Sequence, residues 1–173
     1  MNLNFIPFPT LTTERLMLRR MNITDQNEIF FLRSNENILE FIDIPKAETV
    51  DDAIKFIEKI NNNIAENESI MWAITLKENS TLIGTICLWN IDVENNKADI
   101  GYMLHPEFQG KGIMQEAVEK VIEYGFATMQ LSLVVADFHE KNLRSLKLLE
   151  KNGFIYETKS GDYLVYSLQK PNP

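Results

Sequence analysis

The chain has 173 residues, 45% of them hydrophobic and 24% charged, and its formal net charge at pH 7 is −8. This length suits one compact domain, and we expect residues 1–173 to form it. The negative charge argues against direct nucleic-acid binding, and no apolar run approaches the roughly 20 residues of a membrane span. The single cysteine, Cys87, lies in an apolar run and is expected to be a buried structural thiol. With no secretory signal at the N-terminus, a cytoplasmic location is favoured.

The first half of the chain predicts helices and a run of antiparallel strands. Helical spacing of apolar residues marks 25–33 and 50–65, and in the second segment these residues form one stripe. Short polar breaks at 78–80 and 94–96 are typical of hairpin turns. The strand-like segments of this half are 15–19, 70–76, 82–89 and 98–104.

The second half predicts helices and strands in alternation. Residues 131–136 form a continuous apolar run, the pattern of a strand buried on both faces, and they follow a strongly amphipathic helix over 113–126. A further helix over 143–150 precedes strand-like segments at 154–157 and 163–168. The order indicates an α/β domain whose central crossover leads from one strand through the long helix to the next.

The sharpest chemical feature is the segment Pro106-Glu-Phe-Gln-Gly-Lys-Gly-Ile-Met114, between a predicted strand and a predicted helix. Glycine lets a backbone approach a ligand, and the free amides of a first helical turn form a receptor for phosphate. The spacing matches neither a P-loop nor a dinucleotide-binding motif. A plain strand-to-helix turn is the alternative. The candidate phosphate-binding residues are Gln109, Gly110, Lys111, Gly112, Ile113 and Met114.

Gly101 lies inside the strand that precedes this segment. Glycine within a strand marks a bulge or a place where a ligand or another backbone comes close. A ligand lying along the strand edge would explain Gly101. Packing against a neighbouring aromatic side chain, such as Trp89 or Phe126, explains it equally well.

Four segments, in order along the chain, carry a resemblance to a known family. They are Ile100-Gly-Tyr-Met-Leu-His-Pro106, Gln109-x-x-Gly112-x-Met114, Asn142-x-x-Ser145 and Glu150-Lys-Asn-Gly-Phe154. With them the chain resembles the GNAT superfamily of N-acetyltransferases. Together with the opening segment 11–19, it is similar to the branch that acetylates the N-terminal amines of ribosomal proteins. It departs from the family motif at Met114, where glycine or alanine is usual.

The resemblance implies a fold, a cosubstrate and a place for it. The fold is a mixed sheet of about seven strands with an antiparallel N-terminal half and a splayed parallel pair, flanked by about four helices. The cosubstrate is acetyl-coenzyme A, with no metal. Its pantetheine arm is expected along the backbone of Tyr102, Met103 and Leu104. The amide of Met103, or that of Leu104, would stabilise the oxyanion that forms when an amine attacks the thioester.

The resemblance also assigns side chains at and just before the helix predicted at 143–150. Many family members have a tyrosine acid at the position of Leu149, whereas the ribosomal-protein branch has serine at the position of Ser145. That hydroxyl would donate to the coenzyme A sulfur. The family uses the side chain matching Asn142 to hold pantetheine, although asparagine is also a common N-cap. Cations expected either to pair with coenzyme phosphates or to be solvated are Lys111, Lys141 and Arg144.

Attack on a thioester needs a neutral amine, so a base is required. Asp99 alternates with Gly101 and Met103 on one strand face and is the candidate base, acting directly or through water. A solvated acid at a strand end is the alternative reading. His105 is a second candidate, but a histidine before proline is more often structural or exposed.

The acceptor is expected to be a primary amine, in first place a protein N-terminal α-amine. A small-molecule amine (a polyamine, an amino acid or an antibiotic), a non-catalytic module that binds acyl-coenzyme A, and a nucleotide-binding protein are the alternatives. We expect the acceptor cavity to be built from the early helices within 25–65, with Phe41, Asp43 and Glu48 as candidates between them. A homodimer is left open.

Overall fold

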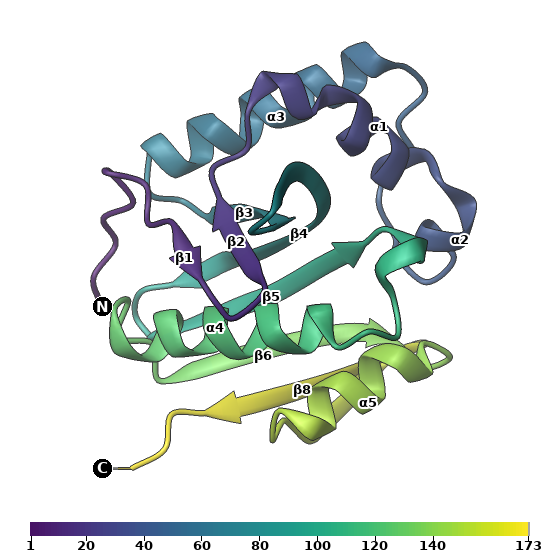
Figure 1. Cartoon of the computed structure of the whole chain (residues 1–173). Helices are drawn as coiled ribbons and strands as arrows, with labels where there is room; N and C mark the ends of the chain where they lie inside the picture. The colour runs from purple at the N-terminus through teal and green to yellow at the C-terminus, as the bar shows by residue number, and fades with distance from the viewer. Residues whose placement is uncertain (173) are drawn as a thin grey trace.

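One eight-stranded sheet runs through the computed structural model, which describes residues 1–172 (Figure 1). The strands are β1 (Leu11–Thr12), β2 (Leu16–Arg19), β3 (Ile70–Leu76), β4 (Asn79–Asp92), β5 (Lys97–Leu104), β6 (Leu133–His139), β7 (Ile155–Ser160) and β8 (Tyr163–Gln169). Their order is β1-β2-β3-β4-β5-β6-β8-β7, and among these neighbours β5 and β6 are the parallel pair.

The helices are α1 (Gln26–Ser34), α2 (Glu36–Leu39), α3 (Val50–Ala65), α4 (Ile113–Ala127) and α5 (Leu143–Lys151), with the 3-10 turns η1 (Ile23–Asp25) and η2 (Pro106–Phe108). The expected fold class is confirmed. The described residues contain one strand more than expected because β1 has only two residues, and one helix more because α2 has only four. None of these helices is long and apolar enough to cross a membrane.

Two elements coincide with the predictions residue for residue, α3 and β3. Helix α3 begins at a capping box in which Thr49 and Asp52 each accept a hydrogen bond from the other's backbone amide. Its buried residues, Ala53, Ile57, Ile60 and Ile64, form the expected stripe, while Ile54 is only half-buried. The hairpin between β3 and β4 turns at residues 77–78, one residue earlier than expected, because Leu76 already pairs with Asn79.

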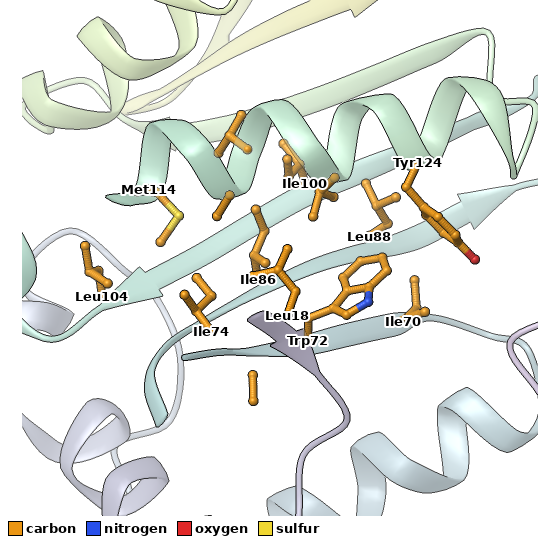
Figure 2. Packing of buried hydrophobic residues seen from close by; sticks show 14 of the residues in the cluster. Leu18, Ile70, Trp72, Ile74, Ile86, Leu88, Ile100, Leu104, Met114 and Tyr124 are labelled. Carbon is orange, nitrogen blue, oxygen red and sulfur yellow. The ribbon is translucent and has the colours of Figure 1, made fainter. Parts of the chain in front are cut away.

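Helices cover both faces of the sheet. Helix α1 packs on β4 and α3 on β3, while α4 and α5 lie on the opposite face (Figure 1). Figure 2 shows the core beneath α4, where Trp72, Ile86 and Leu88 fill the space between helix and strands. The indole of Trp72 donates to the Pro9 carbonyl at 2.8 Å and meets Tyr124 of α4 edge to face. This core fixes α4, and with it the start of that helix.

Strand β6 corrects a prediction. It begins at Leu133 rather than at residue 131, and it is buried on one face only. Val134, Ala136 and Phe138 are buried, whereas Asp137 between them is exposed. The expectation of burial on both faces is wrong because α1 and α3 cover β3 and β4 and leave the same face of β6 open.

The parallel pair separates soon after it begins. Lys97, Ala98 and Asp99 pair with residues 133–135, and beyond Asp99 the two strands no longer pair, although β5 runs on to Leu104 and β6 to His139. Residues 100–104 therefore present a strand edge without a neighbour on the β6 side. An open edge of this kind accepts an extended ligand as an added strand.

Candidate active site

A cleft of about 1840 Å³ follows the gap between β5 and β6. This volume exceeds the 300–1,000 Å³ that is usual for a single small ligand, so the cleft has room for two reactants. One end is bordered by the loop before α4 and by the start of α5, and the other by α1, α2, α3 and β4. The centre of the Phe41 ring lies 5.5 Å from that of the His139 ring, so the segment after α2 contacts the end of β6.

The loop before α4 has the geometry of an anion receptor. Gly110 and Gly112 have φ values of 73° and 75°, in the left-handed region that favours glycine. Within residues 1–172, none of the backbone amides of residues 110–114 has a hydrogen-bond acceptor. These amides precede or open a helix of 15 residues, whose dipole places positive potential at the same point. The predicted residues Gly110 to Met114 are thus brought together as free donors.

Arg15 holds this loop, a role that sequence reasoning missed. Its guanidinium donates to the Lys111 carbonyl at 2.9 Å and to the Glu116 carboxylate at 2.8 Å. Burial raises the pKa of Glu116, but hydrogen bonds from Thr13 and Arg15 outweigh it and hold that pKa below its ordinary value. Because the Lys111 carbonyl is turned toward Arg15, the amides of residues 110–114 are left without an acceptor within the protein.

Gln109 contributes its side chain within the protein. Its amide nitrogen donates to the Leu104 carbonyl at 3.0 Å, and its amide oxygen accepts from Arg144 of α5. The residue therefore ties the loop to the end of β5 and to α5. The ammonium group of Lys111 lies 5.6 Å from the centre of the Phe108 ring and forms no ion pair among the described residues.

The register of β4 and β5 decides which backbone groups of β5 face the gap. His105 donates to the Ile83 carbonyl at 2.8 Å, and hydrogen-bonded pairs alternate along an antiparallel ladder. Met103 therefore bonds to β4, whereas the amides of Tyr102 and Leu104 point toward the gap. Of the two oxyanion candidates left open by the sequence, this register favours Leu104. No register shift occurs at Gly101.

Tyr102 and Ser145 form a hydroxyl pair that the sequence did not reveal. The phenol of Tyr102 donates to the oxygen of Ser145 at 3.1 Å, and Ser145 is only 7% exposed. Burial raises the pKa of Tyr102 to about 12, so the phenol stays protonated at working pH. Ser145 keeps its own proton free to donate. Leu149, at the position of the usual tyrosine acid, is fully buried.

Asn142 caps α5. Its side-chain oxygen accepts the Ser145 amide at 3.2 Å, which is the N-cap reading of this residue. The side-chain nitrogen has no hydrogen-bond partner in residues 1–172 and remains a donor. His105 also has a structural place, because its ring accepts the Glu107 amide and stacks on Phe31 at 4.5 Å.

Asp99 lies on the sheet face opposite to the side chain of Tyr102. Burial raises the pKa of this carboxyl, and the charge of Asp137 on β6 raises it further. The side chain of Asn90 donates to Asp99 at 2.8 Å and opposes the rise. Asn90 itself has φ 47°, beside the register shift between Trp89 and Asp92. The register shift in β4 thus places the side chain of Asn90 where it donates a hydrogen bond to Asp99.

Gly101 lies on the same face as Asp99, where a side chain would be crowded. A Cβ atom there would come within 3.2 Å of the Cys87 sulfur and 3.6 Å of the Trp89 indole nitrogen. The contact with Cys87 is the tight one, whereas 3.6 Å is an ordinary van der Waals distance, so crowding by Cys87 rather than packing against Trp89 accounts for this glycine. Burial raises the pKa of the Cys87 thiol to about 12. The thiol is consequently protonated, but Cys87 is only half-buried and lines the cleft, so the expectation of a buried thiol is not met.

The acceptor side of the cleft contains two of the three residues expected there. Phe41 and Asp43 line it, together with Phe56 of α3 and Trp89 of β4. Glu48 does not line the cleft, because it precedes α3, where its backbone amide donates to Asp52. Trp89 is 47% exposed, so the floor of this part offers an accessible aromatic surface.

A splayed parallel pair beside a glycine-rich helix start defines a class of transferases that take an acyl group from a coenzyme A thioester. The model of the acetyltransferase (GNAT) domain family matches residues 15–155. The chain therefore belongs to the GNAT family, and it is an N-acetyltransferase. Acetyl-coenzyme A is the acetyl donor of this family.

Relatives and solved structures agree with this assignment. The uncharacterized N-acetyltransferase p20 of Bacillus licheniformis is 36% identical over 154 residues, which cover 89% of this chain and 86% of p20. YdaF of Bacillus subtilis, for which ribosomal N-acetyltransferase activity is proposed, is 40% identical over 84 residues, 49% of this chain and 46% of YdaF. The structure of RimL, a ribosomal α-N-protein acetyltransferase, with coenzyme A matches with a TM-score of 0.84 at 19% identity, covering 93% of this chain and 98% of RimL. At that identity the likeness concerns the fold alone.

Proposed function

We propose that the protein acetylates the α-amine at the N-terminus of a protein or peptide. The observation that carries the proposal is one cleft with free loop amides at one end and the hydroxyl pair of Tyr102 and Ser145 in the middle. Asp99 does not line this cleft itself, but Asn90, which donates to it, does. The likeness to YdaF, over about half of each chain, supports a peptide acceptor.

The residues of the donor end fit coenzyme A. The free amides of residues 110–114 suit its pyrophosphate, and the edge of β5 from Tyr102 to Leu104 suits the pantetheine arm. The free side-chain nitrogen of Asn142 would donate to a pantetheine carbonyl. When bound, acetyl-coenzyme A supplies a thioester carbonyl open to attack by an amine. The amide of Leu104 would donate to the negative charge that develops on the carbonyl oxygen.

Asp99 would take the proton of the acceptor amine through bridging water, because it lies outside the cleft lining and about 16 Å of extended strand from Leu104. Its pKa is raised, so its carboxylate is a better proton acceptor than an exposed aspartate. An α-amine with a pKa near 8 is already partly neutral at pH 7, whereas a lysine amine with a pKa near 10.4 is not. One half-buried carboxylate therefore suits an α-amine better than a lysine side chain, and this supports the N-terminal assignment.

Ser145 would supply a proton to the leaving sulfur. The hydrogen bond from Tyr102 occupies a lone pair of the Ser145 oxygen and leaves the serine proton directed elsewhere. Donation from a hydroxyl stabilises a developing thiolate even without complete transfer. Tyr102 then acts as a positioning residue that orients Ser145.

The test is an acceptor panel with release of free thiol as the readout and mass spectrometry to locate the acetyl group. The panel contains peptides with free N-termini, the same peptides with blocked N-termini and one lysine, spermidine, and free amino acids. We expect acetylation at the α-amine of the first group. Transfer to spermidine or to lysine side chains with none to free N-termini would refute the proposal.

A further inference from the structure

Arg33 differs from the other arginines of the chain. Within residues 1–172 its guanidinium forms no hydrogen bond or ion pair, although it is half-buried. Each of the other four arginines donates to an acceptor within the protein: Arg15 to Glu116, Arg19 to Asp25, Arg20 to Asn61 and Arg144 to Gln109. No buried side-chain nitrogen or oxygen of the described residues lacks a hydrogen-bond partner, so the nitrogens of Arg33 are open to solvent and available to a ligand.

The position of the guanidinium is nevertheless fixed. Its central carbon lies 3.8 Å from the centre of the Phe56 ring, a cation–π contact between α1 and α3. The backbone carbonyl of Arg33 accepts the Ala47 amide at 2.8 Å, which anchors the last turn of α1. Burial lowers the pKa of the guanidinium, and no carboxylate offsets this. The contact holds the flat cation by its face and leaves the N–H groups at its edge unused.

Arg33 lines the acceptor side of the cleft. It belongs to the wall made by α1 and α3, with Phe56 and Lys59, and not to the loop that carries Gly110 and Gly112. Lys59 lies almost one helical turn beyond Phe56 and also forms no ion pair within residues 1–172. The carboxylates of Glu40 and Asp43 line the same cleft, yet neither pairs with Arg33.

We propose that Arg33 binds an anionic group of the acceptor, a carboxylate or a phosphate, close to the amine that is acetylated. The planar guanidinium presents paired N–H donors that match either group in a bidentate contact. A purely structural role would be to cover the Phe56 ring with the side-chain stem. That role needs no charge, and methionine would fill it. The proposal rests on the proposed function and adds to it the chemistry of the residues that follow the acceptor amine.

The wild-type enzyme provides the first test. Three peptide pairs begin with alanine and carry aspartate or asparagine at the second, third or fourth residue, and one pair carries phosphoserine or serine. Alanine and alaninamide form a small-molecule pair with a carboxylate or an amide. We expect the anionic member of at least one pair to show a kcat/KM about 10- to 100-fold higher, the range of a hydrogen bond to a charged group. The pair that responds identifies the source of the anion.

The variant Arg33→Met provides the second test, because it keeps an unbranched side chain over Phe56 and removes the charge and the donors. We expect the preference for the anionic acceptor to fall to within about twofold of unity, while kcat/KM for the neutral acceptor changes little. Arg20→Met is the matched control: it removes one charge from an exposed arginine outside the cleft and should keep the preference. Thermal unfolding of both variants separates a loss of folding from a loss of selectivity.

Two results would overturn the inference. One is equal kcat/KM within every wild-type pair, and the other is a preference that survives in Arg33→Met. Either result leaves N-terminal acetylation intact as long as the peptides are acetylated. Conversely, if only the small-molecule pair reacts and favours the carboxylate, the peptide acceptor is refuted and the role of Arg33 stands.

Discussion

The hydroxyl pair of Tyr102 and Ser145 permits a double-mutant test of the chemical step. Ser145→Ala removes the donor to the leaving sulfur, and we expect it to lower single-turnover acetylation by about 10- to 1,000-fold. Tyr102→Phe removes one neutral hydrogen bond of 3.1 Å, worth about 0.5–1.5 kcal/mol, and should lower the rate roughly 2- to 12-fold. Because Tyr102 acts through Ser145, the double variant should be no slower than Ser145→Ala within about threefold.

Release of free thiol from saturating acetyl-coenzyme A, measured in single turnovers, isolates chemistry from product release. The exposed residues Ser132 and Tyr156 supply matched controls, as Ser132→Ala and Tyr156→Phe. Since the pKa of Tyr102 is raised to about 12, its ionisation should not limit the rate below about pH 11. Effects that multiply in the double variant, or an unchanged rate in Ser145→Ala, would refute the assigned roles.

Three further predictions concern the donor loop, the base and the cysteine. Gly112→Val should raise the KM for acetyl-coenzyme A more than about tenfold, because valine disfavours a φ of 75°. Gly161→Val is the control: Gly161 has a φ of 58° in a distant turn, so the variant imposes similar strain and should leave that KM unchanged. Asn90→Gly keeps the left-handed backbone but removes the donor to Asp99, so the pKa of Asp99 should rise. The acidic limb of the pH profile of kcat/KM should then move to higher pH by as much as about one unit. An acidic limb that does not move contradicts the role of Asp99 as base. The Cys87 thiol, with its pKa raised from 9.0 to about 12, should react with iodoacetamide at pH 8 about 1,000-fold more slowly in the native than in the unfolded protein. Equal rates by mass spectrometry would disprove the raised pKa.

The elements predicted from sequence were those whose pattern is local. Helix α3 has a capping box and a regular apolar stripe, and both are set by residues within a few positions of one another. The loop before α4 was predicted for the same reason, because its glycines and the helix that follows are contiguous. Strand β6 was misjudged because the pattern 131–136 mixes two residues of the preceding loop with a strand whose open face is set by distant helices.

The contacts that sequence did not predict all join distant parts of the chain. Arg15 is 96 residues from the Lys111 carbonyl that it holds, and Tyr102 is 43 residues from Ser145. Neither spacing has a periodic signature, so only the folded sheet brings such groups together. The same holds for Arg33 and Phe56, whose contact depends on how α1 crosses α3. Contacts of this kind occur on both the donor and the acceptor side of the cleft, and on neither side does a local pattern predict them.

Strand alternation explains how one strand serves both proton transfers of the proposed reaction. The side chain of Tyr102 extends from one face of β5 to Ser145, while that of Asp99, three residues earlier, extends from the other. The gap beside β6 lies between the two faces. The amine would then lose its proton on the side of α1 and α3, and the sulfur would gain one on the side of α4 and α5. A shift of β5 by one residue relative to β4 would exchange these two faces. The register shift of β4 lies after Trp89, so the pairs that fix residues 99–104 stay regular and each side chain keeps its face.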